Sequence, residues 1–264
     1  RMHKEEKLSF KNVISFNLDE YYPMEPNSIN SYVRFMKELL FDHVDILPEN
    51  AHVPDGLLTK EQIADYCHEY EAKIEALGGI DLQILGIGGN GHIGFNESGS
   101  LQNSKTRLVA LDHITRVAAS KDFSGLSNTP RTAITLGVKK IMEAKKVILM
   151  AWGEGKANII KKSVEDEVTN RIPASFLQEH NNAVFILDKE ASSKLTRINK
   201  PWLVEKVIWT DKLTRKAVLG LALELKKPIL MLTDADYIEN GMSDLLAHSG
   251  PAYDINIDIF NKLQ

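Results

Sequence analysis

The chain has 264 residues, and its 32 Lys and Arg residues against 36 Asp and Glu residues give a formal net charge of −4 at pH 7 with His counted as neutral. This balance argues against a nucleic-acid binder that relies on overall positive charge, because phosphate recognition needs an excess of Lys and Arg on at least one face. Hydrophobic residues make up 43% and charged residues 26% of the chain. These values are ordinary for a globular protein, and the length predicts one large domain or one with a small appendage.

The cysteine content and the apolar runs bear on the cellular compartment. A single cysteine, Cys67, excludes an internal disulfide framework and a thiolate metal cluster, and it favours a reducing environment. Apolar runs such as residues 146–152 are far shorter than the roughly 20 residues of a membrane-spanning helix. The first residues contain no apolar signal core and begin in mid-pattern, so we expect missing upstream sequence. We expect a cytoplasmic protein without a membrane partner.

Short apolar runs alternate with amphipathic stretches along most of the chain. We expect strands at 12–17, 82–86, 107–112, 132–136, 147–152 and 183–187, and helices at 29–44, 60–77, 138–144, 156–167 and 174–180. Alternation of this kind is typical of a parallel sheet with crossover helices. The sequence therefore predicts an α/β fold, an open, mostly parallel sheet with helices on both faces.

The pattern changes after residue 195. A Lys-Pro-Trp sequence interrupts it, and two helices and a short apolar run follow, at 211–225, 237–247 and 228–232. Asp211 is expected to cap the first of these helices. We expect a main domain over residues 1–195 and a small C-terminal α/β appendage or linker subdomain over residues 196–264.

A glycine-rich segment follows the expected strand 82–86. Gly86, Gly88 and Gly91 match the G-x-G-x-x-G pattern of dinucleotide sites, and Asp112 follows about 20 residues later. A nicotinamide dehydrogenase is therefore one alternative, and a simple chain-reversing turn is another. The dinucleotide match is weak because the true pattern opens an apolar helix that holds the pyrophosphate, whereas residues 92–103 have two further glycines and no helical period.

Polar side chains stand at the ends of two expected strands. His92, Asn96 and Glu97 lie in the loop after 82–86, where α/β sheets place their chemistry. Asp19 and Glu20 follow the strand 12–17, and a partly buried carboxylate can serve as a general base. Solvated turn residues and metal ligands are the alternatives for these side chains. No catalytic metal is expected, because neither H-x-x-H nor H-E-x-x-H occurs in the sequence.

Three ordered motifs together resemble the glucosamine-6-phosphate deaminase family. They span residues 9–21, 86–97 and 115–118, and the similarity continues through 132–138 and 153–157 to the strand near Asp188. The resemblance covers roughly residues 7–195.

This resemblance implies a Rossmann-like fold of the deaminase/6-phosphogluconolactonase type and an aldose–ketose isomerisation coupled to deamination. Glucosamine 6-phosphate would become fructose 6-phosphate and ammonia without cofactor or metal. By position, Asp19 is implied as the base that moves the C2 proton to C1. His92 is implied in opening the sugar ring, and Glu97 in holding and tuning the imidazole.

The resemblance also implies a set of substrate-binding residues. Lys121 and Lys156 match two basic phosphate ligands of the family, and a cation beside a helix N-terminus completes an anion site. Glu20, Gly88 and Gly91 complete the expected set. Ordinary solvated lysines remain the alternative for both cations.

The chain departs from the family pattern in several places. Asn90, which we count among the catalytic residues, stands where the family has Asp, and it lacks the charge that favours imidazolium, so we expect a weakened or altered deaminase. The Gly/Ser/Thr-rich phosphate loop of the family has no counterpart before the first strand, so we expect poor phosphate binding. Residues 196–264 resemble the connecting region of longer bacterial proteins with a second enzymatic domain, such as a deacetylase of N-acetylglucosaminyl groups.

Arg107 is an allosteric candidate. In allosteric members of the family a basic residue at this position helps to bind the activator N-acetylglucosamine 6-phosphate, and a second basic position is occupied here by Val109. The sequence leaves open whether the protein is a homo-oligomer.

Two alternatives remain beside the amino-sugar deaminase. A 6-phosphogluconolactonase-like hydrolase shares the fold and the glycine-rich loop but does not need Asp19 as a base. A non-catalytic sugar-phosphate sensor would keep the pocket and lose the chemistry, and Asn90 is the residue that suggests it. For each of them the expected ligand is a small sugar phosphate, with no nucleic acid, metal or other cofactor.

Overall fold

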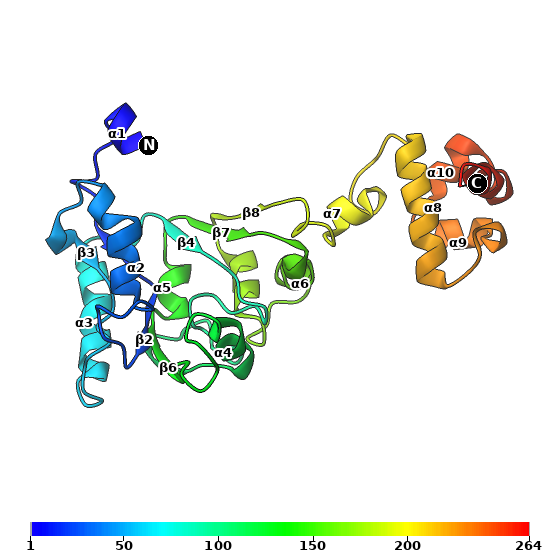
Figure 1. The fold of residues 1–264 in the computed structure, drawn as a ribbon. Coiled ribbons are helices and arrows are strands. Elements are labelled where there is room, and N and C mark those ends of the chain that lie inside the picture. The colour runs from blue at the N-terminus through cyan, green and yellow to red at the C-terminus, as the bar shows by residue number, and fades with distance from the viewer. Residues whose placement is uncertain (1, 264) are drawn as a thin grey trace. The chain divides into compact units, whose positions relative to one another are not determined.

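The computed structural model describes residues 2–263, and the chain divides into two compact units (Figure 1). The first unit runs from Arg1 to Ser192 and the second from Ser193 to Gln264, so the division lies close to the expected boundary at residue 195. The sequence-derived boundary rests on the break in periodicity, whereas this division rests on how the residues pack. Each unit is described by itself.

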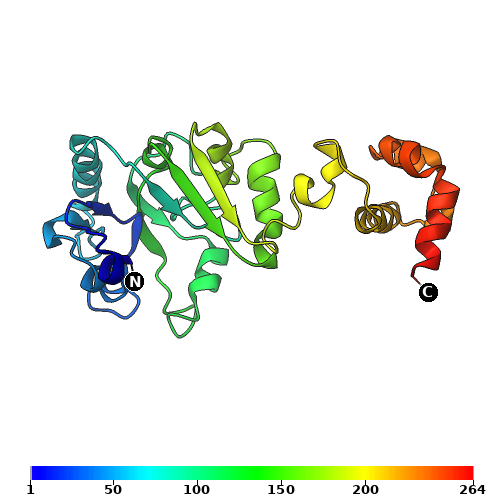
Figure 2. The ribbon, with the colours of Figure 1, turned by 90° about the horizontal axis from the view of Figure 1, so that it is seen from above.

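The strands of the first unit form three sheets. β4 (Gln83–Leu85), β7 (Val147–Ala151) and β8 (Ala183–Leu187) lie side by side and are parallel (Figure 1, Figure 2). β1 (Ser15–Phe16) and β3 (Ala51–His52) form a second parallel pair. β2 (Asp19–Tyr22), β6 (Thr132–Thr135) and β5 (Arg107–Ala110) form an antiparallel sheet.

The α/β class with parallel sheets flanked by helices is therefore confirmed, and one detail is corrected. The sequence predicted one continuous sheet, but the segment from β1 to β2 is divided between two sheets. β2 pairs with β6 in the antiparallel sense, with Asp19 opposite Thr135. Polar residues fill the first half of β2, so its strand character comes from this pairing and not from an apolar pattern.

The helices of the first unit are shorter than the sequence predicted. They are α1 (Met2–Glu6), α2 (Tyr32–Leu39), α3 (Ile63–Ala76), α4 (His113–Ala119), α5 (Val138–Met142) and α6 (Ala157–Glu165). Short 3₁₀ turns span Phe41–His43, Pro48–Asn50, Glu154–Lys156 and Pro173–Glu179. The expected helix 174–180 is thus a 3₁₀ turn, and α1 and α4 were not predicted.

Burial along the parallel sheet shows where the core lies. Alternate residues of β7, Val147 and Leu149, are fully buried, while Met150 between the buried positions is exposed. Ile84 of β4 and Ile186 of β8 are also exposed. Because successive side chains of a strand point to opposite faces, one face of this sheet carries the core among the described residues. The loops at the ends of these strands carry the polar residues considered below.

The second unit is helical throughout its described residues, which corrects the expected α/β appendage. It consists of α7 (Thr196–Asn199), α8 (Asp211–Leu225), α9 (Asp234–Glu239), α10 (Ser243–Ser249) and α11 (Ala252–Asn261), with 3₁₀ turns at Pro201–Leu203 and Ile229–Met231. The apolar run 228–232 holds the second of these turns and no strand. Its side chain Leu232 instead joins a helical core with Tyr237 and Leu245.

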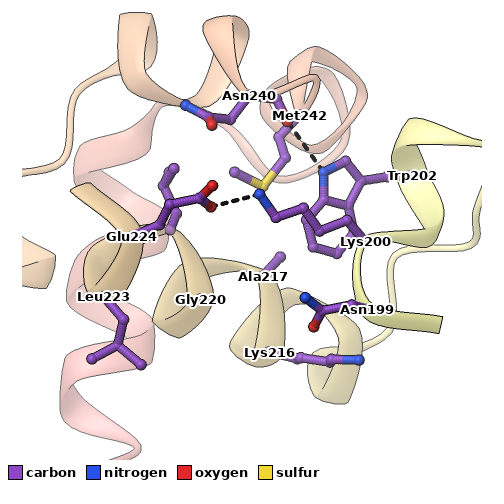
Figure 3. A pocket seen from close by; sticks show the side chains of 11 residues that line it. Asn199, Lys200, Trp202, Lys216, Ala217, Gly220, Leu223, Glu224, Asn240 and Met242 are labelled. Atoms are coloured by element: carbon purple, nitrogen blue, oxygen red, sulfur yellow. Dashed lines mark hydrogen bonds and ion pairs between the residues drawn. The ribbon is translucent and has the colours of Figure 1, made fainter. Parts of the chain in front are cut away.

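Two further features belong to this helical unit. Thr210, and not Asp211, caps α8, because its hydroxyl accepts a hydrogen bond from the Leu213 amide at 3.3 Å. A cavity of about 400 Å³ lies against α8, with an ion pair of 2.5 Å between Lys200 and Glu224 at its side (Figure 3).

None of the described helices in either unit is a candidate for a membrane span.

Candidate active site

Asp19 begins β2 next to the glycine-rich loop. The Phe95 amide, which donates to Thr135 Oγ1 at 3.1 Å, also lies near the Asp19 carboxylate. A Cβ at Gly94 would stand 3.2 Å from Asp19 Oδ2, so the loop passes close over the carboxylate. Burial, and then the charge of Glu20, raises the pKa of Asp19 from 3.8 to about 7, although the backbone amide of Phe95 opposes the shift. A carboxylate with this pKa can both take up and release a proton near neutral pH.

Glu20, the neighbour of Asp19, points into the N-terminus of α2. Its buried carboxylate accepts hydrogen bonds from the Tyr21 amide (2.9 Å), the Ser31 hydroxyl (2.9 Å), the Tyr32 amide (2.8 Å) and the Val33 amide (3.2 Å). Burial raises the pKa of Glu20, and these four donors oppose the rise. Glu20 therefore anchors α2, and the substrate contact expected of it stays a prediction.

The loop after β4 is a tight turn built on Gly88. The Gly88 amide donates to the His92 carbonyl at 3.0 Å, and the Gly91 amide donates to the Gly88 carbonyl at 3.0 Å. A Cβ at Gly88 would lie only 2.2–2.4 Å from three atoms of the His92 ring. Glycine at this position therefore lets the imidazole lie directly on the turn. Because the described chain contains no helix between β4 and β5, this loop lacks the helix N-terminus that the dinucleotide alternative requires.

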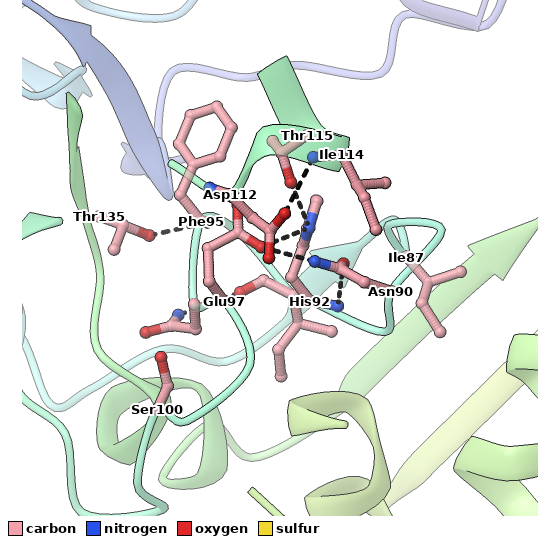
Figure 4. A network of polar contacts seen from close by, with 12 residues as sticks. Ile87, Asn90, His92, Phe95, Glu97, Ser100, Asp112, Ile114, Thr115 and Thr135 are labelled. Atoms are coloured by element: carbon pink, nitrogen blue, oxygen red, sulfur yellow. Dashed lines mark hydrogen bonds and ion pairs between the residues drawn. The ribbon is translucent and has the colours of Figure 1, made fainter. Parts of the chain in front are cut away.

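Glu97 is the centre of a polar network around His92 (Figure 4). Its Oε2 lies 3.2 Å from His92 Nδ1 and accepts a hydrogen bond of 2.8 Å from Asn90 Nδ2. The Asp112 amide donates to Oε1 at 3.2 Å. Burial raises the pKa of Glu97, but the hydrogen bonds of His92, Thr115 and Asn90 outweigh it and bring the pKa down from 4.5 to about 2. Glu97 is thus held as an anion beside the imidazole.

Thr115 and Asp112 complete this network. The sequence assigned no role to Thr115 and considered Asp112 only as the acidic residue of the dinucleotide alternative. Thr115 Oγ1 lies 3.2 Å from His92 Nδ1, and the hydroxyl also hydrogen-bonds Glu97. Asp112 caps α4 by accepting the Ile114 amide at 2.8 Å. Thr115 falls in one of the motifs that carry the family resemblance, so that motif was the available signal.

The two expected phosphate ligands differ in position. Lys156 follows β7 and donates from Nζ to the Ile87 carbonyl at 2.7 Å, so it lies against the glycine-rich loop. Burial lowers the pKa of Lys156. Lys121 is exposed just beyond α4, and among residues 2–263 no hydrogen bond or ion pair ties its ammonium to the loop.

Arg107 contacts the later part of the same loop. Its guanidinium donates to Asn96 Oδ1 at 2.9 Å, to Ser100 Oγ at 2.9 Å and to the Lys105 carbonyl at 3.1 Å. Burial lowers its pKa. Arg107 also lines a cavity of about 410 Å³ whose wall includes Ser98, Ser100, Ser104 and Val109. Residues 2–263 contain no group of three or more His, Cys, Asp or Glu side chains placed to hold a metal ion.

An α/β fold that places a carboxylate beside a loop with a histidine–glutamate pair is typical of enzymes that act on small molecules by proton transfer. The match to protein families agrees with this. Residues 1–186 match the model described as glucosamine-6-phosphate isomerases/6-phosphogluconolactonase, and the chain belongs to this family. The resemblance inferred from the three motifs is thereby confirmed.

Individual relatives extend the comparison. The chain is 54% identical over 264 residues to a putative glucosamine-6-phosphate deaminase-like protein of Bacteroides thetaiotaomicron, matching 100% of this chain but 40% of that protein. It is 45% identical over 192 residues to a glucosamine-6-phosphate deaminase of Thermoanaerobacter, covering 73% of this chain and 75% of the relative.

Solved structures agree with the fold. A monomeric glucosamine-6-phosphate deaminase superposes with a TM-score of 0.71 at 36% identity, over 74% of this chain and 80% of the other. A 6-phosphogluconolactonase of Trypanosoma brucei superposes with a TM-score of 0.55 at 21% identity, over 68% and 73%, and this likeness concerns the fold alone.

Proposed function

We propose that this protein converts glucosamine 6-phosphate to fructose 6-phosphate and ammonia by aldose–ketose isomerisation coupled to deamination. The observation that carries the proposal is the placement of Asp19 against the same loop that holds the His92–Glu97 pair. One base can carry out a proton transfer between adjacent carbons, and a carboxylate with a pKa of about 7 suits this task. The deaminase relatives support the assignment.

In this proposal Asp19 removes the proton from C2 of the open-chain amino sugar and returns it at C1. The resulting imine is hydrolysed to the ketose, which releases ammonia. At neutral pH the ionised and protonated forms of Asp19 are both well populated, because its pKa is about 7. His92 assists the earlier ring opening by moving the proton of the ring hydroxyl, and the Glu97 anion stabilises the charge that the imidazole gains.

Phosphate binding is assigned to Lys156, with Lys121 as a second cation. Support for Lys156 comes from its contact with the Ile87 carbonyl, which brings the ammonium to the loop that holds His92. The lowered pKa of Lys156 reflects burial, and an anion in contact would offset that desolvation. Gly88 and Gly91 are assigned to the turn on which the substrate rests, and the role of Lys121 rests on the family resemblance alone.

Arg107 and its cavity are assigned to an anionic effector. Guanidinium and serine hydroxyl groups suit a phosphate monoester, and Ser98, Ser100 and Ser104 line the cavity with Arg107. Asn96 connects this site to the catalytic loop, because it accepts from Arg107 and donates to the Ile93 and Leu136 carbonyls at 3.0 and 2.9 Å. Val109 supplies no second charge, so we expect weak activation.

The compartment and partners follow from the proposed substrate. A phosphorylated sugar and a free, buried Cys67 fit the cytoplasm. The chain spans 40% of the length of the Bacteroides relative, and the fused downstream enzymatic domain stays a prediction. The oligomeric state stays open.

Hydrogen exchange at C2 tests the proposal directly. In deuterated buffer with glucosamine 6-phosphate, the wild type is expected to exchange the C2 hydrogen and release ammonia. Asp19→Asn is expected to lose both, while the exposed-residue control Asp65→Asn keeps both. Saturable binding without exchange would identify a sensor. Hydrolysis of 6-phosphogluconolactone that survives Asp19→Asn would identify a lactonase.

A further inference from the structure

Thr115 is buried in contact with both members of the His92–Glu97 pair. It is the third residue of α4, its Oγ1 lies 3.2 Å from His92 Nδ1, and its hydroxyl hydrogen-bonds Glu97. In Figure 4 the side chains of Asn90, Glu97 and Thr115 converge on the imidazole. A threonine hydroxyl carries a single proton, so its two contacts cannot both use it as a donor.

Glu97 decides which contact takes the hydroxyl proton. Its carboxylate already accepts from Asn90 Nδ2 and from the Asp112 amide. An ionised carboxylate only accepts hydrogen bonds, so Thr115 donates to Glu97. The Thr115 oxygen is then left to accept from His92 Nδ1. The second neighbour of Nδ1, Glu97 Oε2 at 3.2 Å, is also an acceptor.

We infer that Thr115 is a positioning residue that, together with Glu97, fixes the proton of neutral His92 on Nδ1 and leaves Nε2 as the free proton acceptor. If the proton were on Nε2, the lone pair of Nδ1 would face the lone pairs of Thr115 Oγ1 and Glu97 Oε2, which is repulsive. The tautomer therefore follows from the hydrogen-bond partners of the ring. That Nε2 then accepts a proton from a sugar hydroxyl rests on the proposed function.

The surroundings of Thr115 hold the hydroxyl in this orientation. Threonine has few χ1 rotamers in a helix, and Asp112 fixes the start of α4 through its hydrogen bond to the Ile114 amide. Arg116 ties the same helix to the loop before β6, donating to the Leu126 carbonyl at 2.9 Å and the Thr129 carbonyl at 3.2 Å. The bare backbone of Gly88 leaves room for the imidazole.

Two substitutions separate the hydroxyl from the volume of the side chain. Thr115→Val keeps the branched shape and removes the hydroxyl, whereas Thr115→Ser keeps the hydroxyl. Thr129→Val is the matched control, because Thr129 is also a buried threonine but its hydroxyl bonds the Gly125 carbonyl at 3.1 Å, outside the network. Thr115→Ala serves as a second hydroxyl-free variant if the valine disturbs packing.

The first readout is the tautomer of His92, measured by ¹⁵N NMR of the ring nitrogens without any substrate. We expect the wild type, Thr115→Ser and Thr129→Val to show the proton on Nδ1. Thr115→Val and Thr115→Ala are expected to show a mixture of the two tautomers. A wild-type ring protonated on Nε2, or an unchanged tautomer in both hydroxyl-free variants, would overturn the inference.

The second readout is deamination of glucosamine 6-phosphate. We expect Thr115→Val to lower kcat by about 10- to 100-fold with KM changed less than about threefold, since the hydroxyl acts through the imidazole. Thr115→Ser is expected to recover most of the rate, and equal losses in the serine and valine variants would contradict a positioning role. A wild type with the Nδ1 tautomer and no deamination would refute the proposed function while leaving the tautomer assignment intact.

Discussion

Replacing Asp19 by Asn removes a carboxylate whose negative charge is destabilised in the folded protein by burial and by the charge of Glu20. Burial and the nearby Glu20 raise the pKa of Asp19 from 3.8 to about 7. Because the folded state binds this proton more tightly than the unfolded state, the protein loses stability as pH rises between these two values. The wild type therefore carries the full penalty above about pH 7. The neutral amide of Asn avoids this penalty.

The size of the effect follows from the shift. About three pKa units at 1.36 kcal/mol each correspond to an upper limit of about 4 kcal/mol. Residue 19 is partly accessible to solvent, so we expect about 2 kcal/mol after screening. In a unit of this size such a gain raises Tm by about 4–8 °C.

Urea unfolding of wild type, Asp19→Asn and the control Asp65→Asn at about pH 5 and about pH 8 measures this directly. The Asp19→Asn variant is expected to gain stability relative to wild type as pH rises, while the control gains little at either pH. The same variant loses deamination, so stability and activity move in opposite directions. Equal effects of Asp19→Asn at both pH values, or destabilisation at pH 8, would refute the assignment of a high pKa to Asp19.

Three further predictions concern the glycine-rich loop. Gly88→Ala places a Cβ 2.2–2.4 Å from the imidazole ring, and we expect kcat to fall by at least about 100-fold. The control Gly89→Ala, whose Cβ meets nothing within 4 Å, is expected to keep activity. Similar rates for the two variants would argue against the observed ring position. Asn90→Asp puts a second carboxylate beside Glu97, so the two carboxylates should titrate at higher pH and together favour the imidazolium form of His92. We expect faster turnover and a shifted pH–rate profile. A rate equal to wild type would contradict the weakening assigned to Asn90. Lys156→Met should raise KM for the sugar phosphate by about 10-fold or more in steady-state kinetics, and an unchanged KM would remove Lys156 from the phosphate site.

The elements that the sequence predicted well are those whose pattern is set by burial. The apolar run 183–187 coincides with β8, and 147–152 contains β7, because both strands pack side by side in the parallel sheet. β2 was expected as a polar strand end, yet residues 19–22 form a strand because β6 pairs with them. Long-range pairing of this kind leaves little trace in local composition. The reverse holds for the apolar run 228–232, which was wrongly expected within an α/β appendage. It has no strand partner among the described residues and contains a 3₁₀ turn instead.

The candidate site was predicted in part. Asn90, His92 and Glu97 lie close together in one loop, and short sequence separation with glycine-driven turns made this predictable. Lys156 reaches the loop from a distant segment, and only the family resemblance suggested it. Thr115 was not assigned, because its contact joins residues from separate elements and a lone threonine has no distinctive pattern.

Ammonia release from glucosamine 6-phosphate is the measurement that tests the central claim most directly. The protein is assayed in chelator-treated, nucleotide-free buffer, with fructose 6-phosphate measured in parallel. We predict equal amounts of ammonia and fructose 6-phosphate from the wild type and neither product above background from Asp19→Asn. A requirement for NAD, loss of activity with chelator, or lactone hydrolysis without any ammonia would contradict the account.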